Sequence, residues 1–284
     1  YRGYDSAGLA LLNPSLMRLR SVGRVAELAA QAAEQTACMG IAHTRWATHG
    51  VPSERNAHPH VSGNLAVVHN GIIENYAELR GVLVAEGYVF TSDTDTEVIA
   101  HLIQHIQKTT PDLFMAVQQA TTQLTGAYAI GVIQEGESRI IVARHGAPLL
   151  LGVGEDGHYA ASDAAALLQV TRQIIYLEEG DCAELKQDGL NIVGADGTAV
   201  SRPIVQSSLS ADAVELGEYQ HYMQKEIFEQ PQALAATLEM ISGAQTFTPN
   251  LFGVAAPELL TGVKSVLILA CGTSYHSGLV AKYW

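Results

Sequence analysis

The sequence predicts an α+β domain built mainly from antiparallel sheets, followed by the opening of a doubly wound α/β domain. Through residues 1–206, short apolar segments of β type are separated by glycine or charged residues, as in strands joined by tight connections. Helical segments lie among these strands in blocks, without the strict alternation of a parallel sheet. Later, residues 263–270 are apolar on both faces, which is typical of a buried parallel strand.

The N-terminal segments supply a strand, a helix and two loops. Residues 8–12 are apolar and predict a strand, and the alanine-rich residues 26–36 predict a helix. Residues 41–50 (IAHTRWATHG) have no helical or strand periodicity, so we expect a polar site loop after a short strand. The prolines of residues 52–60 predict a further irregular loop.

Residues 65–69 predict a strand that stops at Asn70-Gly71. Asn-Gly is the strongest short signal for a hairpin turn, so a plain turn is one interpretation of this pair. The leucine and valine spacing of residues 75–86 predicts a helix that ends at Gly87.

A second helix is expected after residues 92–97 (SDTDTE). Thr94 and Glu97 fit a capping box, and the apolar face behind them consists of Val98, Leu102, Ile103 and Ile106. Asp95 then lies in the first turn, where the helix dipole favours an acid. From the residues alone, this structural role for Asp95 is more expected than a ligand contact.

The pattern changes to β type from residue 127 onward. Strands are expected at residues 127–134, 139–143, 149–153, 174–177 and 182–185, and helices at residues 113–123 and 163–169. Residues 1–206 thus predict one domain, residues 207–217 a polar linker, and residues 218–284 the start of a second domain.

The second domain should open with a helix over residues 221–238, in which Pro231 marks a kink or a boundary between two helices. The expected strand at 263–270 is followed by a loop of small residues and then a helix. Backbone N–H groups, hydroxyls and a helix N-terminus at such a place suit a phosphate, although one loop is a weak signal. The candidate residues are Cys271, Gly272, Thr273 and Ser274.

Composition excludes several function classes. The chain of 284 residues carries 16 Lys+Arg against 29 Asp+Glu, a formal charge of −13, which argues against nucleic acid or an anionic membrane as the main partner. We see neither a spanning apolar run nor a signal peptide. The three cysteines Cys38, Cys182 and Cys271 are widely spaced, which predicts a reducing, cytoplasmic location and no metal site.

Several separate stretches resemble one family, the glucosamine-6-phosphate synthases or isomerising glutamine–fructose-6-phosphate aminotransferases. The matches follow the family's order along almost the whole chain. They are residues 1–8 (YRGYDSAG), 43–50 (HTRWATHG), 69–75 (HNGIIEN), 94–97 (TDTE), 177–181 (LEEGD), 221–227 (HYMQKEI) and 269–275 (LACGTSY).

The resemblance implies an N-terminal-nucleophile glutaminase domain, a four-layer αββα sandwich, followed by a sugar isomerase (SIS) domain. The family transfers ammonia from L-glutamine to D-fructose 6-phosphate and makes D-glucosamine 6-phosphate and glutamate, the first step of hexosamine synthesis. It uses no metal or redox cofactor, and its members are often homodimers. Neither nucleic acid nor membrane is expected as a partner.

The resemblance also assigns roles to individual residues. Arg45 matches the clamp for the glutamine α-carboxylate, a role that suits a planar guanidinium. Asp95 matches the partner of the α-amino group, and Thr48 and His49 match supporting contacts on a loop that we expect to close as a lid, hinged at Gly50. Asn70 and Gly71 match the oxyanion hole, Trp46 matches the gate of the ammonia passage, and the sugar-phosphate site matches Cys271, Gly272, Thr273 and Ser274. A half-buried packing role stays open for Trp46, and we expect His43 and Thr44 to position Arg45.

In this family the nucleophile is the cysteine at the start of the mature chain. Here the first residue is Tyr1, about two dozen family positions later, and the last, Trp284, falls within an expected helix. We therefore expect a fragment that lacks glutaminase activity by itself.

Two alternatives remain open from the sequence. One is another N-terminal-nucleophile amidotransferase, such as the enzyme that opens purine synthesis, although residues 221–227 and 263–274 speak against it. The other is a catalytically silent module that binds glutamine and sugar phosphate.

Overall fold

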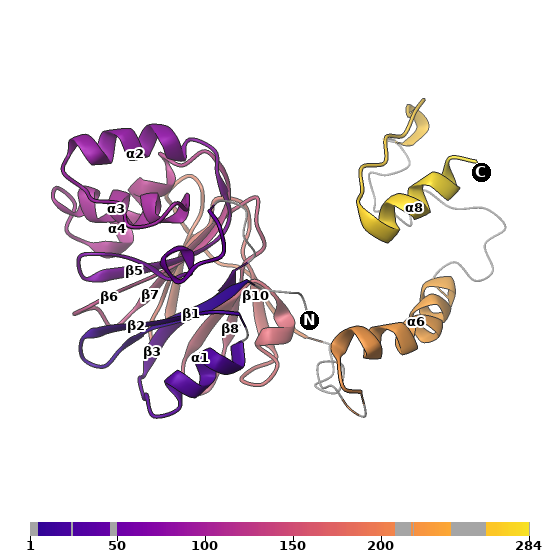
Figure 1. Ribbon diagram of the computed structural model, residues 1–284, viewed down its shortest axis with the longest axis horizontal. Coiled ribbons are helices and arrows are strands. Elements are labelled where there is room, and N and C mark those ends of the chain that lie inside the picture. Colours follow the sequence, from indigo (N-terminus) through magenta and orange to yellow (C-terminus); the bar gives the residue numbers. More distant parts are fainter. Residues whose placement is uncertain are drawn as a thin grey trace. The chain divides into compact units, whose positions relative to one another are not determined.

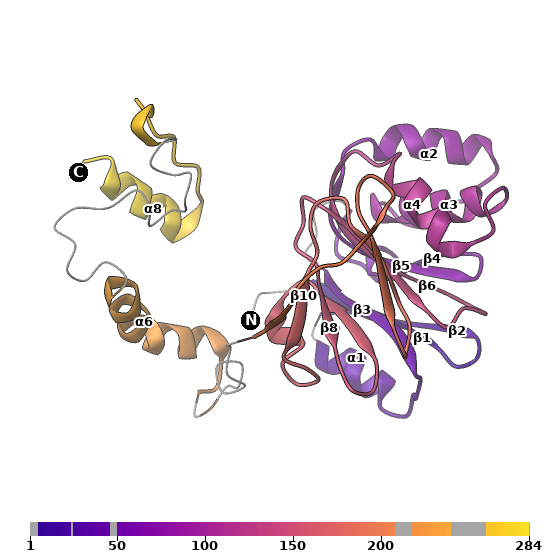
Figure 2. The same ribbon diagram turned by 180° about the vertical axis from the view of Figure 1, so that it is seen from behind.

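The computed structural model describes residues 5–23, 25–45, 50–207, 217, 219–239 and 260–283. The chain divides into two compact units, Tyr1–Gly217 and Glu218–Trp284. The first unit contains the sheets and is shown from two opposite sides in Figures 1 and 2. The predicted linker, 207–217, lies almost entirely outside the described residues, and the domain limits given above remain predictions.

A seven-stranded antiparallel sheet forms the centre of the first unit. Its order is β13-β12-β11-β7-β6-β5-β4. The strands are β4 (His60–Ser62), β5 (Leu65–Ile73), β6 (Gly126–Gln134), β7 (Ile140–His145), β11 (Cys182–Leu185), β12 (Leu190–Val193) and β13 (Ala199–Val200). β5 and β6 are the longest pair, with nine paired residues in each strand, and β5 carries Asn70 and Gly71 of the candidate site.

Three helices cover one face of this sheet: α2 (Tyr76–Ala85), α3 (Thr96–Gln107) and α4 (Leu113–Thr121). Alternate residues of the strands pack against them, because successive side chains of a strand point to opposite faces. The largest core cluster joins Val67, Ile130 and Ile141 of the sheet to Ile99 and Ile103 of α3. Burial of each such side chain stabilises the folded state by about 1.5–3 kcal/mol.

Two smaller sheets cover the other face. One has the order β2-β1-β3 and the other the order β14-β10-β8-β9. Ala10 and Ile41 of the first pack against Ala66, while Leu151 of the second packs against Val142. The strands are β1 (Ser6–Leu12), β2 (Leu16–Val22), β3 (Met39–Arg45), β8 (Leu150–Val153), β9 (His158–Ala161), β10 (Gln173–Tyr176) and β14 (Ile204–Gln206).

Helix α1 (Val25–Ala32) packs on β1 and β2, and the 3₁₀ turn η2 (Ala164–Ala166) lies against β8 and β10. The layers therefore run helix, sheet, sheet, helix. This arrangement confirms the αββα sandwich that the resemblance implied. A further 3₁₀ turn, η1 (Glu54–Asn56), lies in the predicted irregular loop before β4.

Two local predictions in this unit are wrong. Residues 41–45 belong to strand β3, because their backbone pairs with β1 from Ile41↔Ala10 to Arg45↔Ser6. Asn70-Gly71 is not a hairpin turn: β5 runs through both residues and pairs with β6, Asn70 opposite Ala129. Sheet pairing on β1 and β6, which local sequence does not reveal, overrides the loop and turn signals at these positions.

The second unit contains the described helices α6 (Tyr222–Glu239) and α8 (Gly272–Ala281). A single helix spans Pro231, so of the two predicted alternatives, a kink or a boundary between two helices, the boundary is wrong. The predicted buried strand at 263–270 is also wrong: in the described part of this unit, these residues pair with no strand, and Leu267 is 81% exposed. A strand needs a neighbour to satisfy its backbone groups. None of the described helices is long and apolar enough to cross a membrane.

Candidate functional site

The site begins with Asn70 and Gly71 near the end of β5. Asn70 follows Ala66 and Val68 along the strand, so it faces the two smaller sheets. Gly71 has a φ of +127°, and a Cβ at this position would lie 2.0 Å from the carbonyl oxygen of Ala127 on β6. Only glycine permits this close approach of β5 to β6.

His43 holds the side chain of Asn70 from across the sandwich. His43 Nε2 lies 2.7 Å from Asn70 Oδ1. An amide oxygen only accepts, so Nε2 is the donor and Asn70 Nδ2 remains the donor end of the amide. Within the described part of the chain this nitrogen has no acceptor. The expectation that His43 positions Arg45 stays a prediction; the contact that the structure gives its side chain is with Asn70.

Arg45 lies two residues after His43, on the same face of β3. It is 3% exposed. Its guanidinium donates to the carbonyl oxygen of Gly50 at 3.0 Å and to Asp5 Oδ1 at 3.5 Å, and the Arg45 carbonyl accepts from the Asp5 N–H at 3.0 Å. The sequence analysis gave Asp5 no role beyond its place in the matching stretch of residues 1–8. The structure makes it a direct partner of Arg45. These contacts fix a cation at the end of β3.

Asp95 is buried at the N-terminal end of α3, with 4% exposure. Its Oδ2 accepts a hydrogen bond of 2.8 Å from the backbone N–H of Ile73, three residues after Asn70 on β5. The side chain makes no capping bond to its own helix. This contact ties the start of α3 to β5, and the ligand role of Asp95 stays a prediction.

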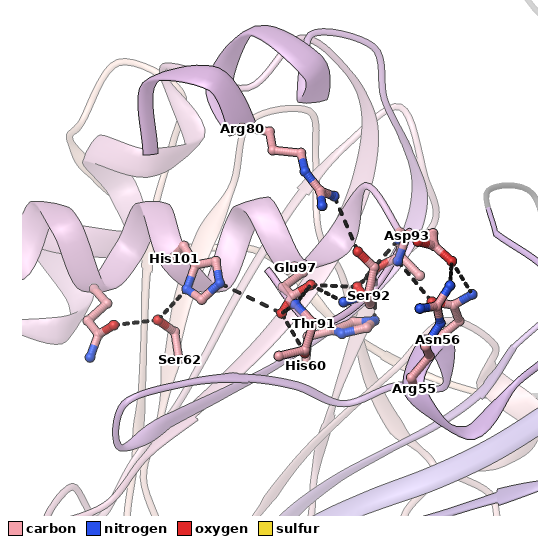
Figure 3. Close-up of polar contacts among 12 residues, drawn as sticks. Arg55, Asn56, His60, Ser62, Arg80, Thr91, Ser92, Asp93, Glu97 and His101 are labelled. Carbon is pink, nitrogen blue, oxygen red and sulfur yellow. Dashed lines mark hydrogen bonds and ion pairs between the residues drawn. The ribbon is translucent and has the colours of Figure 1, made fainter. Parts of the chain in front are cut away.

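Glu97 does not form the predicted capping box with Thr94. Its carboxylate instead accepts from the backbone N–H groups of Thr91 and Ser92, and from both hydroxyls. His101 Nε2 lies 3.7 Å from it (Figure 3). Burial alone raises the pKa of the Glu97 carboxyl, but the interaction with His101 and the hydrogen bonds from Thr91 and Ser92 outweigh it and hold that pKa below its usual range. The anion therefore fixes the loop that leads to Asp95.

Four histidines are enclosed around this region, and sequence analysis did not group them: His43, His58, His60 and His69. His58 Nε2 and His69 Nδ1 each lie 2.9 Å from the hydroxyl of Thr96, and the rings of His43 and His58 are 4.1 Å apart. Burial lowers the pKa of all four, that of His43 to about 4. The cluster is therefore neutral near pH 7.

A cavity of about 490 Å³ lies next to Asn70, between the two layers of sheets. Residues 40–44 of β3 line one side, and residues 158–162 of β9 and the turn after it line the other. Both strands are edges of their sheets in the described structure, since β3 pairs with β1 and β9 pairs with β8. The Asn70 amide therefore faces an open space bordered by unpaired strand edges.

Neither of the two cysteines of the first unit lines this cavity. Cys38 is exposed and precedes the opposite end of β3 from Arg45, about 20 Å away at the rise of a strand. Cys182 lies in the helix-side core, where burial raises the pKa of its thiol. Cys271 belongs to the second unit. The described residues contain no cluster of side chains suited to a metal ion.

The remaining predicted site residues fall into two groups. Trp46, Thr48 and His49 lie outside the described residues. Cys271, Gly272, Thr273 and Ser274 are exposed at the start of α8, where Cys271 has extended backbone and Gly272 has a φ of +60°. The predicted helix N-terminus is therefore present without the strand before it.

Residues 43–169 match the glutamine amidotransferase domain family. Over its full length the chain is 52% identical to a glutamine–fructose-6-phosphate aminotransferase (isomerising) of Xylella fastidiosa, covering 47% of that protein. The proteins of the same name from Acidithiobacillus ferridurans and Vibrio cholerae are 54% and 52% identical, and the chain covers 48% and 47% of them. The chain thus spans about half the length of these curated relatives.

Solved structures give a consistent fold. The glutamine phosphoribosylpyrophosphate amidotransferase of B. subtilis, complexed with ADP and GMP, matches with a TM-score of 0.60 and 26% identity over 69% of this chain and 44% of its own. A structure described as the allosteric regulatory enzyme of purine biosynthesis matches with a TM-score of 0.59 and 28% identity, over 68% of this chain and 43% of its own.

Proposed function

We propose that this chain serves the transfer of nitrogen from L-glutamine to D-fructose 6-phosphate. The chain belongs to the glutamine amidotransferases, and it is related along its whole length to isomerising glutamine–fructose-6-phosphate aminotransferases. The products are glutamate and D-glucosamine 6-phosphate. The single observation that carries the glutamine half is the His43–Asn70 hydrogen bond of 2.7 Å, which occupies Oδ1 and leaves Nδ2 as the donor end of a residue that lines the cavity.

In this proposal the reactive carbonyl of glutamine lies in the cavity beside Asn70. A thiolate attacks the side-chain amide, and the negative charge that develops on the carbonyl oxygen is stabilised by Asn70 Nδ2 and the backbone N–H of Gly71. The leaving nitrogen takes up the proton that the thiol gave up on forming the thiolate, so collapse of this intermediate breaks the C–N bond and releases ammonia; water then hydrolyses the thioester, which frees the thiol and glutamate. Removal of one such donor typically slows turnover by about 10²–10³-fold.

The two charged ends of glutamine are assigned to Arg45 and Asp95. Arg45 offers a fixed, buried guanidinium for the α-carboxylate, and Asp95 offers a carboxylate for the α-ammonium group. Thr48 and His49 are proposed as supporting contacts and Trp46 as the ammonia gate, on the strength of the resemblance. Neither Cys38 nor Cys182 lines the cavity, so neither is assigned the role of the thiol nucleophile.

The sugar-phosphate half is proposed for the second unit. The start of α8 at Gly272 offers backbone N–H groups, with the hydroxyls of Thr273 and Ser274 beside them, for the phosphate of D-fructose 6-phosphate. Val266, Leu267 and Leu269 are 78–83% exposed in this unit, which supports burial against further protein and the homodimer that the family resemblance implies.

The purine-pathway alternative is less well supported. Its structural relatives resemble the chain at 26–28% identity over 68–69% of its length, whereas the isomerising aminotransferases match at 52–54% over all of it. The isomerising aminotransferases therefore match over both units of the chain.

Arg45→Lys in the complete protein tests the proposal. A lysine keeps the charge and loses the planar fork, so the KM for glutamine should rise at least tenfold while the KM for D-fructose 6-phosphate stays unchanged. An unchanged KM for glutamine would contradict the assignment. Binding without any glutaminase or synthase turnover in the unmutated complete protein would favour the silent module instead.

A further inference from the structure

Asn56, the last residue of η1, is completely buried, with 0% exposure. Its Oδ1 accepts from the backbone N–H of Asp93 at 2.9 Å, and its Nδ2 donates to the carbonyl oxygen of Val51 at 2.9 Å (Figure 3 shows the contact with Asp93). A weaker contact of 3.4 Å joins Nδ2 to the Asp93 carboxylate. Because one partner is a backbone donor and the other a backbone acceptor, the orientation of the amide is fixed.

The first end of this bridge leads to Arg45. Val51 follows Gly50, whose carbonyl oxygen accepts from the Arg45 guanidinium at 3.0 Å. Gly50 also packs directly on the amide, since a Cβ at this residue would lie 2.6 Å from Asn56 Nδ2. Its φ of +79° is the left-handed conformation that suits glycine. Gly50, which accepts the hydrogen bond from Arg45, therefore packs directly against Asn56.

The second end leads to Asp95. Asp93 lies two residues before it, in the loop that Glu97 holds from the other side through Thr91 and Ser92. Asp95 itself is tied to β5 through Ile73. A shift of Asp93 is thus transmitted along two peptide units to a carboxylate that has a fixed strand contact. The buried side chain of Asn56 thus couples movement of the Gly50–Val51 segment to movement of the Asp93 loop, beside the direct packing of Gly50 on Asp93.

We propose that Asn56 is a positioning residue that sets the separation between Arg45 and Asp95, and so makes the site specific for a ligand with adjacent carboxylate and ammonium groups. This inference rests on the proposed glutamine site. The carboxylate and the ammonium group of an α-amino acid are bonded to the same carbon. The groups that bind them, Arg45 and Asp95, must therefore be held at one fixed separation. A misplacement of about 1 Å in such a site costs up to about 10²-fold.

The test is Asn56→Asp in the complete protein, with two ligands. Aspartate keeps the shape and the acceptor for the Asp93 N–H, but it cannot donate to Val51. The ligands are L-glutamine and 4-carbamoylbutanoate, which has the same carboxylate and amide but lacks the α-amino group. The affinity for L-glutamine should fall by about tenfold or more, and that for 4-carbamoylbutanoate by less than about twofold. Equal losses for both ligands, or no loss for either, would overturn the inference.

A second variant keeps the test decisive if Asn56→Asp fails to fold. The new Cβ of Gly50→Ala would lie 2.6 Å from Asn56 Nδ2 and displace the same amide. Like Asn56→Asp, this variant should reduce the preference for L-glutamine over 4-carbamoylbutanoate. Asn75→Asp is the matched control, because Asn75 also bridges a backbone carbonyl, of Gln123, and a backbone N–H, of Thr125. It should leave the preference unchanged; a reduction as large as that of Asn56→Asp would assign the effect to general loosening and contradict the inference.

Failure of the proposed function gives a different result. An unmutated protein that binds neither ligand, or both equally, overturns the glutamine site and the inference with it. An unmutated protein that prefers L-glutamine, combined with an Asn56→Asp variant that keeps this preference in full, overturns only the role of Asn56.

Discussion

His43 Nε2 and Asn70 Oδ1 are 2.7 Å apart, and this hydrogen bond joins the end of β3 to the end of β5 across the two layers of sheets. It occupies Asn70 Oδ1 and leaves Nδ2 as the donor end of the amide. Neither residue alone indicates the contact, since they lie 27 positions apart in the sequence. The proposed oxyanion donor is thus held by a histidine to which no chemical step is assigned.

Replacement of His43 by alanine should lower kcat for glutamine hydrolysis by about 10- to 100-fold, because Asn70 loses the donor that orients its amide. The KM for glutamine should change little, since neither Arg45 nor Asp95 is touched. His43→Gln is the matched variant, because a glutamine amide N–H can still donate to Asn70 Oδ1, and it should recover much of the loss. Steady-state kinetics of the three proteins decides this; equal defects in both variants would contradict the orienting role.

The free energy of unfolding should fall as the pH drops below the ordinary histidine pKa, because the buried histidines stay neutral in the folded protein. The pKa of His43 is lowered to about 4, and those of His58, His60 and His69 are also lowered, each chiefly by burial. The unfolded chain takes up these protons near the ordinary pKa of about 6.5, so stability is complete above that pH and falls below it. Each such histidine contributes about 1.4 kcal/mol per pH unit.

Urea denaturation at steps from pH 7 to pH 4.5 measures this slope. The lowered pKa of Glu97 acts only below the ordinary carboxyl range, so it does not contribute in this window. The His60→Gln variant should show a shallower slope than the unmutated protein. A free energy of unfolding that stays constant between pH 6.5 and 4.5 would contradict the neutral, buried state of the cluster.

Gly71→Ala should destabilise the first unit, because the new Cβ would lie 2.0 Å from the Ala127 carbonyl oxygen at a φ of +127°. The backbone conformation alone costs about 1–3 kcal/mol. Gly81→Ala in α2 is the control: nothing lies within 4 Å of its Cβ position, and alanine should stabilise the helix by about 1 kcal/mol. Thermal melts that shift in the same direction for both variants would contradict this description of β5 and β6.

Thr273→Ala should raise the KM for D-fructose 6-phosphate and leave basal glutaminase unchanged, because Thr273 lies at the start of α8 in the second unit. The KM values for the two substrates, measured separately, check this. A change confined to glutamine kinetics would place the sugar-phosphate site elsewhere.

Apolar periodicity and glycine positions, which are local signals, predicted many of the elements of the first unit, and the family resemblance implied its layers. It failed where pairing with distant strands decides the structure: residues 41–45 were expected to be a loop, and Asn70-Gly71 was open to a turn. Both belong to sheet ladders whose partners, β1 and β6, are remote in sequence. At 263–270 the apolar pattern was typical of a strand, yet no described strand pairs with it.

For the site, the family resemblance supplied Arg45, Asn70, Gly71 and Asp95. It gave no role for Asn56 or for the histidine cluster, and it left His43 unassigned. These residues act through contacts between segments, such as His58 with Thr96 and Asn56 with Asp93. Such contacts depend on how the loops fold onto α3, and a single sequence carries no pattern for them.

The kinetic effect of Asn70→Ala in the complete protein tests the central claim most directly. If Asn70 Nδ2 stabilises the oxyanion, kcat for glutamine hydrolysis should fall by about 10²–10³-fold while the KM for glutamine stays within about twofold, because the lost interaction forms only in the transition state. A variant with near-normal kcat, or one whose loss lies entirely in the KM, would contradict an oxyanion hole at the end of β5.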